Sequence, residues 1–345
     1  MPGTLAIKTS ELSMLYNPGL FAAKKQGLQG LNLEVPQGSI FGYLGQNGAG
    51  KTTTIKILMG LQFATAGEAW IMDENVRDSR ARRNVGFMPE NPYFYEYLNA
   101  EEALEFYGKL SGMDRAARRA RAQQLISDFG LGHAQKVQLR NYSKGMRQRL
   151  GLAQAVMHKP PLVVLDEPMS GLDPLGRRDV RNVILALRDA GQTVFFSSHI
   201  LGDVEEICDR VCVLDRGRKV AEGPISSLLT GRVLEVHLAA SGIDSKGCAE
   251  AAALAMRTWH DGALYHVLVD SEEKAQKVKD LLEKSGGVLR VMQPHKESLE
   301  EYFVRVTDHS SGDGMGKPPV LVDPALTADG SSAAKTTVAS TEARP

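Results

Sequence analysis

One stretch of the sequence has the residue types and spacing to bind phosphate. It comprises Gly45, Gln46, Asn47, Gly48, Ala49, Gly50, Lys51, Thr52 and Thr53, and it fits the pattern Gly-x-x-x-x-Gly-Lys-Ser/Thr. The glycines let backbone amides curve around an anion with no Cβ in the way. Lys51 is placed to reach the β- and γ-phosphates of a nucleotide, and the Thr52 hydroxyl to bind Mg²⁺. A chance glycine turn is the alternative, but every fixed position of the pattern is filled.

Two segments must hold this loop in place. Residues 39–45, SIFGYLG, precede the loop and predict a strand, while residues 51–60, KTTTIKILMG, predict a helix after it. A helix that begins at Lys51 directs its positive dipole end and its unbonded N–H groups at the same phosphates. The sequence therefore predicts a strand, a phosphate loop and a helix in direct succession.

Further polar residues follow two later buried strands. The apolar run 162–165 is typical of a parallel strand buried on both faces, and Asp166 and Glu167 come directly after it. Ligands of open α/β sheets bind at such strand ends. We therefore interpret Asp166 as a Mg²⁺ carboxylate and Glu167 as an acid that polarises water. Residues 193–198 predict the next strand, which brings His199 to the same edge; plain surface positions are the alternative for these side chains.

The composition argues against several classes of protein. The 345 residues carry 41 basic and 41 acidic side chains, so no basic field for nucleic acid or anionic lipid is suggested. Cys208, Cys212 and Cys248 are too few for a disulfide framework and fit a reducing compartment. Residues 1–30 lack the order of a signal peptide, and no run approaches the roughly 18 apolar residues of a membrane span. We expect any membrane role to come through a partner.

The order of the motifs resembles one known family. The sequence contains, in this order, the phosphate loop, a helical segment, YSKGMRQR at 142–149, LVVLDEP at 162–168, SGLDP at 170–174 and SSH at 197–199. This order is similar to that of the nucleotide-binding subunit of an ABC (ATP-binding cassette) transporter, over about residues 5–230. The C-terminal part, which ends in SLEEYFVRV, resembles the extra domain of bacterial ATPases that pair with type-2 ABC exporter permeases.

The resemblance implies an α/β fold with several parts. We expect a P-loop (RecA-like) ABC ATPase core with an N-terminal antiparallel β region at 1–231, and a helical subdomain inserted at about 91–158. Within the insert, Asn99 and Glu102 predict a helix N-cap pair. A small C-terminal α/β module is expected at 232–306. Residues 307–345 contain no Phe, Trp or Tyr, and we expect them to be disordered.

The resemblance also implies roles for single residues. Asp166 resembles the carboxylate that helps to hold Mg²⁺, and Glu167 the general base for the attacking water. His199 resembles the switch histidine at the γ-phosphate, while Lys51 carries phosphate charge. Tyr16 matches the aromatic residue that stacks on adenine; a half-exposed packing role is its alternative.

A second anion site is expected where another helix begins. Ser143 and Gly145 match two positions of the family signature LSGGQ, and the Ser143 hydroxyl stands at a helix N-terminus. In this family the signature serves the ATP on a second subunit, because two subunits face head to tail and bury two ATP molecules. The signature here reads YSKGM, so Lys144 and Met146 replace the usual Gly and Gln.

Another departure from the family lies before an aromatic run. Glu90 stands where the family usually has a glutamine that touches Mg²⁺ and couples to the permease. A carboxylate is also a hard oxygen ligand, so we expect Glu90 to approach the metal. The aromatic residues after it fit either a groove for a permease helix or ordinary packing; they are Tyr93, Phe94, Tyr95 and Tyr97.

The sequence thus predicts an ATP-binding and ATP-hydrolysing subunit of an ABC transporter, an exporter, with ATP and Mg²⁺ as cofactors. Its expected partners are a second ATPase subunit and an integral membrane permease, without nucleic acid. Its expected place is the cytoplasm, peripheral on the inner face of the membrane. The alternative is a non-transport ABC-type ATPase in translation or DNA maintenance. A single cassette without sustained heptads favours the transporter.

Overall fold

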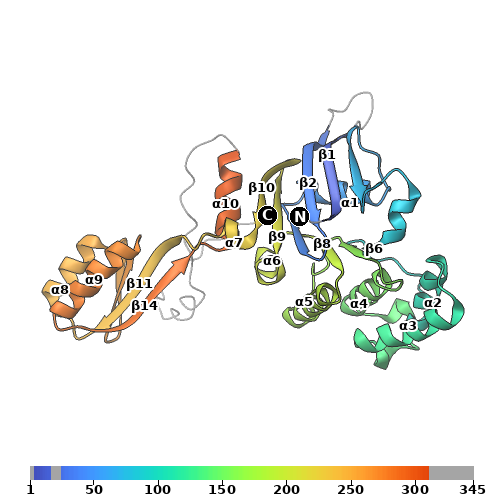
Figure 1. The fold of residues 1–345 in the computed structure, drawn as a ribbon. Coiled ribbons are helices and arrows are strands. Elements are labelled where there is room, and N and C mark those ends of the chain that lie inside the picture. Colours follow the sequence, from blue (N-terminus) through green and yellow to red (C-terminus); the bar gives the residue numbers. More distant parts are fainter. Residues whose placement is uncertain (1–3, 17–24, 311–345) are drawn as a thin grey trace, which may run out of the picture. The chain divides into compact units, whose positions relative to one another are not determined.

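The computed structural model describes residues 4–16 and 25–310, with three β-sheets among them (Figure 1). The first sheet has the strand order β2-β1-β4-β5, the second β10-β9-β3-β8-β7-β6 and the third β12-β13-β11-β14. The strands of the first sheet are β1 (Leu5–Tyr16), β2 (Lys25–Pro36), β4 (Ala66–Ile71) and β5 (Glu74–Asn75). Those of the second are β3 (Ile40–Leu44), β6 (Val85–Met88), β7 (Leu162–Leu165), β8 (Thr193–Ser198), β9 (Arg210–Asp215) and β10 (Arg218–Pro224).

The second sheet carries the core of the chain. Its strands pair in parallel except for β10, which forms an antiparallel hairpin with β9. Both faces are buried, as β3 illustrates: Ile40 and Leu44 enter one apolar cluster, whereas Phe41 and Tyr43 enter the other. A strand covered on both faces reads as a continuous apolar run, which is why β3 and β7 were predictable from sequence.

Helices and the first sheet cover the two faces. The cluster of Phe41 includes residues of β1, β2 and α1 (Lys51–Leu58), while the cluster of Ile40 includes residues of several other helices, three of which follow or precede strands of this sheet. These are α4 (Lys144–Ala155), α5 (Pro174–Asp189) and α6 (Leu201–Ile207). The carboxyl ends of β3, β7 and β8 therefore open onto one edge, directly before Gly45, Asp166 and His199.

The helical segment is stabilised by local caps. Its helices are α2 (Ala100–Leu110), α3 (Arg115–Asp128) and α4, separated by the 3₁₀ turns η2 (Gly132–Ala134) and η3 (Leu139–Asn141). The predicted pair Asn99 and Glu102 forms a complete capping box, and Asp114 caps α3. A further 3₁₀ turn, η1 (Ser79–Asn84), and the short α7 (Ile225–Leu228) connect strands elsewhere. No helix among the described residues has the length and apolar character needed to cross a membrane.

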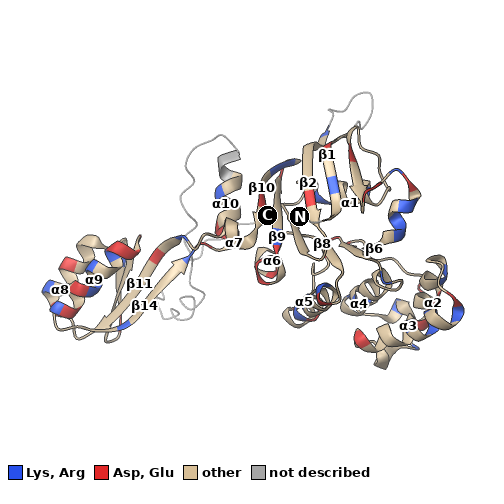
Figure 2. Cartoon of the chain, viewed as in Figure 1, with Lys and Arg blue, Asp and Glu red and all other residues tan. Residues whose placement is uncertain are grey.

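The third sheet belongs to a β-α-β-β-α-β unit. It comprises β11 (Val233–Ser241), α8 (Ser245–Leu254), β12 (Arg257–Asp261), β13 (Leu264–Val269), α9 (Glu272–Lys284) and β14 (Val288–Lys296). All of its neighbouring strands are antiparallel, and residues of α8 and α9 share its apolar cluster. Figure 2 shows both charge signs on these two helices. Strand β12 was not identified from the sequence.

The last helix does not join this third cluster. Helix α10 (Leu299–Ser310) places Leu299, Tyr302 and Phe303 in the cluster of the second sheet, together with residues of α6. The segment SLEEYFVRV, expected to close the C-terminal module, therefore packs on the ATPase core. The helix also runs past residue 307, the expected start of the disordered tail. Residues 311–345, and with them most of that expectation, lie outside the described residues.

Candidate nucleotide site

The phosphate loop adopts a conformation that requires glycine. Gly50 has φ +109°, and a Cβ there would lie 2.5 Å from the carbonyl oxygen of Gly27. No side chain caps the N-terminus of α1 at Gly50. The first amides of this helix are therefore available to an anion, as the sequence predicted.

Lys51 is held inside the site by three oxygen atoms. Its Nζ donates to the carbonyl oxygens of Gly45 at 2.6 Å and Gln46 at 3.4 Å, and it lies 3.2 Å from Oε1 of Glu167. The residue is only 6% exposed. An ammonium has three N–H donors. A phosphate oxygen that approaches Lys51 must therefore replace or share one of these contacts.

Asp166 and Thr52 bring two oxygen donors together. The Thr52 hydroxyl lies 3.4 Å from Oδ1 of Asp166, and the Ser197 hydroxyl donates to the same oxygen at 2.7 Å. Burial raises the pKa of Asp166, and the hydrogen bonds from Ser197 and Thr52 oppose that rise. A cation beside this buried carboxylate would offset its loss of solvation.

Glu167 is fixed in an unusual backbone conformation. Its φ is +50°, in the left-handed region that costs a non-glycine residue of the order of 1–3 kcal/mol. Its amide N–H donates to the hydroxyl of Ser197 at 2.9 Å, and Nδ1 of His199 lies 2.7 Å from its Oε2. The carboxylate thus lies between Lys51 and His199, at the end of β7.

One pocket of about 600 Å³, within the usual range for a small-molecule site, adjoins these side chains, although Asp166, Gly45 and Ala49 do not line it. It is lined by Tyr16, Lys25, Gln26, Gly27, Gln46, Asn47, Gly48, Gly50, Lys51, Thr52, Thr53, Glu90, Glu167, Ser170 and His199. Glu90 is exposed here, just beyond the end of β6. The structure therefore brings Tyr16 and Glu90 to the same pocket as the phosphate loop, although they are far apart in sequence.

Tyr16 reaches the phosphate loop through its hydroxyl. It lies 2.9 Å from the hydroxyl of Thr53, and it donates to Oε1 of Gln62 at 3.1 Å. The ring is half-buried at the end of β1. Its position suits the edge of a nucleotide pocket. Because these two hydrogen bonds hold the ring of Tyr16 in place, the alternative of a packing role also fits the structure.

The signature residues lie elsewhere. Neither Ser143 nor Gly145 lines the pocket described above; the Ser143 hydroxyl caps α4 by accepting from the amide of Met146 at 3.2 Å. Lys144 lies over Gly171, where a Cβ would meet its Nζ. Nearby, Gln148 donates to the carbonyl oxygen of Pro168 at 2.8 Å. The start of α4 is thus connected to the loop that follows Glu167.

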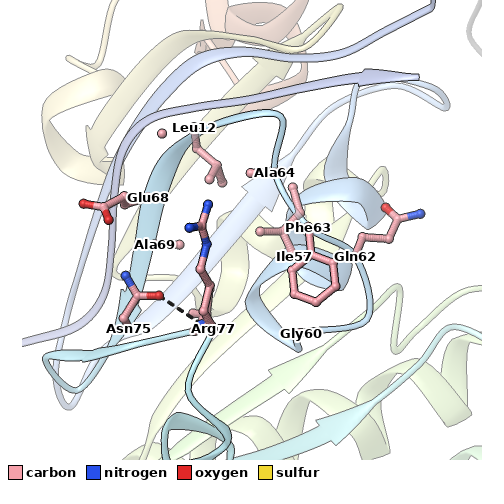
Figure 3. Close-up of a pocket in the computed structure, with 12 residues that line it drawn as sticks. Leu12, Ile57, Gly60, Gln62, Phe63, Ala64, Glu68, Ala69, Asn75 and Arg77 are labelled. Carbon is pink, nitrogen blue, oxygen red and sulfur yellow. Dashed lines mark hydrogen bonds between the residues drawn. The ribbon is translucent and has the colours of Figure 1, made fainter. Parts of the chain in front are cut away.

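A second hollow is too small for a nucleotide. It measures about 20 Å³ and lies between β1, the end of α1 and β4–β5, with Leu12, Phe63 and Arg77 among its lining residues (Figure 3). One water needs about 10–15 Å³ of such space. This cavity therefore has room for little more than one water molecule.

Sequence reasoning missed several residues of the site. Ser197 was recognised only as part of SSH, yet its hydroxyl bonds both Asp166 and Glu167. The feature of the sequence that could have identified Ser197 is the pair of hydroxyl residues directly before His199. Lys25 and Gln26 also line the pocket, and nothing in their sequence context indicated this.

Comparisons with known proteins agree with the geometry. Residues 28–170 match the family model described as ABC transporter. An ABC transporter ATP-binding protein of Synechocystis sp. is 40% identical over 87% of this chain and 84% of its own. The daunorubicin/doxorubicin resistance ATP-binding protein DrrA of Streptomyces peucetius is 34% identical, over 90% and 94% respectively. The bacitracin transport ATP-binding protein BcrA of Bacillus licheniformis is 33% identical, over 87% and 96%.

Solved structures share the fold. An ATP-binding subunit of an ABC transporter is 31% identical with a TM-score of 0.59, over 66% of this chain and 92% of its own. A dimeric ATP-binding cassette in a post-hydrolysis state, bound to ADP and Pi, also has a TM-score of 0.59 at 23% identity. At that identity the second likeness concerns the fold alone.

Proposed function

The chain belongs to the family of ABC transporter ATP-binding proteins, and on this premise we propose that it powers export through a separate membrane permease. Binding and hydrolysis of ATP are the activity of the family. One observation carries the assignment of the chemistry: Glu167 lies between Lys51 and His199 in the pocket of the phosphate loop.

Each of these side chains has a role that its geometry supports. The phosphates of ATP bind at the loop and at the N-terminus of α1, where Lys51 neutralises their charge. Glu167 accepts a proton from the attacking water, as a positioned general base. His199 holds the carboxylate of Glu167 in place through Nδ1 and stands at the open side of the pocket, where it meets the terminal phosphate. Tyr16 supports the base of the nucleotide.

The residues present fit a magnesium ion. Thr52 and Asp166 offer hard oxygen donors 3.4 Å apart, and the hydrogen bonds to the buried carboxylate of Asp166 come from the hydroxyls of Thr52 and Ser197. When bound, Mg²⁺ neutralises phosphate charge during transfer. We assign Thr52 and Asp166 as the residues that would hold it, and we propose that Glu90, which lines the same pocket as Thr52, would also approach it.

The position of the signature residues supports a dimer. Ser143 and Gly145 lie outside the chain's own pocket, at a helix start that suits an anion. We propose that each subunit offers them to the ATP held by a second subunit, so that ATP forms part of the interface. Hydrolysis then weakens the interface, which makes association a ligand-driven switch.

An aromatic surface supports contact with a permease. Tyr93, Tyr95 and Tyr97 are 78%, 45% and 67% exposed, directly after Glu90, while Phe94 is buried. Exposed tyrosines are typical interface anchors. Relatives named for bacitracin transport and drug resistance favour an exporter over a role in translation or DNA maintenance. The protein would then act in the cytoplasm, at the inner face of the membrane.

A pull-down with the variant Glu167→Gln tests this proposal. The variant, loaded with ATP and Mg²⁺, is used to capture partners from detergent-solubilised membranes, with Lys51→Ala as the control that should not hold ATP. A polytopic membrane protein that co-purifies only with Glu167→Gln is the expected result. Ribosomal proteins or nucleic acid in its place would contradict the transporter assignment while leaving the ATP site intact.

A further inference from the structure

Helix α10 is built into the catalytic domain, although it follows the C-terminal module in sequence. Leu299 is fully buried, and Tyr302 and Phe303 are 9% and 7% exposed, in the same apolar cluster as Val204 and Ile207 of α6. The helix also contacts β9 and β10. Its apolar face therefore serves the ATPase core.

A hydrogen bond joins the start of α10 to α6. The amide N–H of Leu299 donates to Oε2 of Glu205 at 2.9 Å. The first amides of a helix have no partner within the helix, and a carboxylate there is also favoured by the helix dipole. Glu205 on α6 thus caps a helix that lies 94 positions later in the chain.

Helix α6 depends on such contacts for its position. It has seven residues, and no side chain caps its N-terminus at Ile200. Helices this short are marginal on their own and are held by tertiary packing. On its other side, Arg181 of α5 lies 2.6 Å from Oδ1 of the buried Asp203. Helix α6 is therefore held between α5 and α10.

His199 lies immediately before α6. The helix begins at Leu201, so the backbone of His199 is set by β8 on one side and by α6 on the other. Its Nδ1 contacts Glu167 at 2.7 Å. The far part of α10 faces the phosphate loop across a hollow, which Thr307 lines together with residues 46–49, Asp215 and Arg216. Both ends of α10 thus adjoin elements of the nucleotide site.

We propose that α10 positions His199 through α6, so that its docking sets the rate of ATP hydrolysis. Glu205 and Phe303 are then positioning residues, which act through α6 and touch no substrate. This inference rests on the role proposed above for His199. It makes the segment that follows the β-α-β-β-α-β unit a required part of the catalytic domain.

Steady-state hydrolysis by the full-length protein tests the inference. Glu205→Ala removes the hydrogen bond between α6 and the amide of Leu299 and leaves the cap that Ser298 and Glu301 form at the start of α10. We expect kcat to fall about fivefold to tenfold with the KM for ATP unchanged, since a misplacement of about 1 Å can cost up to roughly a hundredfold. Glu205→Gln keeps an oxygen acceptor and should restore most of the rate. Phe303→Leu, which loosens the packing of α10 without emptying it, should lower kcat in the same way. Val304→Ala, at the neighbouring exposed position, is the matched control and should behave as wild type.

The variant His199→Ala separates this inference from the function on which it rests. If His199→Ala is impaired while Glu205→Ala and Phe303→Leu hydrolyse ATP at the wild-type rate, the positioning role of α10 is wrong and the role of His199 stands. If His199→Ala itself turns over normally, the proposed role of His199 fails and the inference fails with it. A loss in Glu205→Ala that Glu205→Gln does not restore, or an equal rise in KM, contradicts it as well.

Discussion

At the scale of single residues, the polar side chains of the site hold one another in place. Lys51 and His199 both contact the carboxylate of Glu167, one at each oxygen. The exposed fraction of Glu167 is 7%, so water screens these contacts little. The proposed base therefore keeps one orientation, although its backbone is strained.

Ser197 should be important for both stability and rate. Its hydroxyl accepts from the buried amide of Glu167 and donates to Asp166. Ser197→Ala leaves both groups without that partner, which should cost about 1–3 kcal/mol in the free energy of unfolding and lower kcat. Urea unfolding and phosphate release measure the two effects. Ser127→Ala, at an exposed position of α3, is the control; equal effects in both variants would contradict the bridging role.

Glu90 should affect the metal more than the nucleotide. In the proposed site its carboxylate approaches Mg²⁺, so Glu90→Gln should leave ATP binding largely intact and raise the Mg²⁺ concentration needed for half-maximal hydrolysis. Titrations of ATP binding and of Mg²⁺-dependent turnover measure these quantities separately. Complete loss of ATP binding would refute a ligand role for Glu90 of this kind.

At the scale of elements, short local signals fix where helices begin, and long-range pairing fixes the rest. The capping box at Asn99 is a local signal: its side chain accepts from Glu102, whose carboxylate accepts from the amide of Asn99. The sheet of the C-terminal unit instead arranges His237, Trp259 and His266 from three different strands. Such a cluster exists only after the strands pair.

Loss of the capping box should weaken the helical segment by a modest amount. Asn99→Ala removes the acceptor for the amide of Glu102, which should cost about 1 kcal/mol. Urea unfolding measures the change. Lys109→Ala, at an exposed position near the end of the same helix, is the control and should change stability by less than about 0.5 kcal/mol. A similar loss in both variants would show that the cap contributes nothing special.

The histidine pair should make the C-terminal unit sensitive to acid. Nε2 of His237 lies 2.9 Å from Nδ1 of His266, so one nitrogen must accept and the bond is incompatible with two protonated rings. Burial and the neighbouring His266 lower the pKa of His237, and Glu235 on the same strand opposes this. Trp259 lies parallel to both rings, with Arg257 over it.

The sign of the pH effect follows from the lowered pKa. Below about pH 6.5 the unfolded chain binds a proton at His237 before the folded one does, so stability is lost as pH falls further. We expect the thermal midpoint of Trp259 fluorescence to fall between pH 6.5 and 5 in a Trp70→Phe background. His237→Gln should reduce that dependence. If the thermal midpoint depends on pH equally in both proteins, the histidine pair is not the cause of the pH dependence.

At the scale of the whole molecule, the elements that depend on neighbouring residues could be predicted from the sequence. Those that depend on residues far away in the chain could not. The helix after the phosphate loop, the buried run of β7 and the capping pair Asn99 and Glu102 were evident in sequence, and each is confirmed by the structure. Strand β12 was missed because RTWHD has little apolar pattern and owes its place to pairing with β13. The partner of α10 was missed because an amphipathic helix does not encode which surface it covers.

A mixing experiment tests the proposed head-to-tail dimer. Lys51→Ala disables the phosphate loop, and Ser143→Glu puts a negative charge where the signature should meet phosphate. Each variant alone should be inactive. In a mixed dimer one site combines the intact loop of one subunit with the intact signature of the other, so mixing should restore phosphate release. If the mixture stays inactive although mixed dimers form, the signature does not act across the interface.

The most direct test of the account is phosphate release by Glu167→Gln beside the wild-type protein, with ATP binding and molecular mass measured on the same samples. We expect the rate to fall about 10²- to 10⁴-fold, because the general base is lost while Lys51 and the loop remain. ATP should still bind. The variant should elute as a dimer in the presence of ATP and as a monomer in the presence of ADP. Turnover near the wild-type rate would show that Glu167 is not the base and would contradict the central claim.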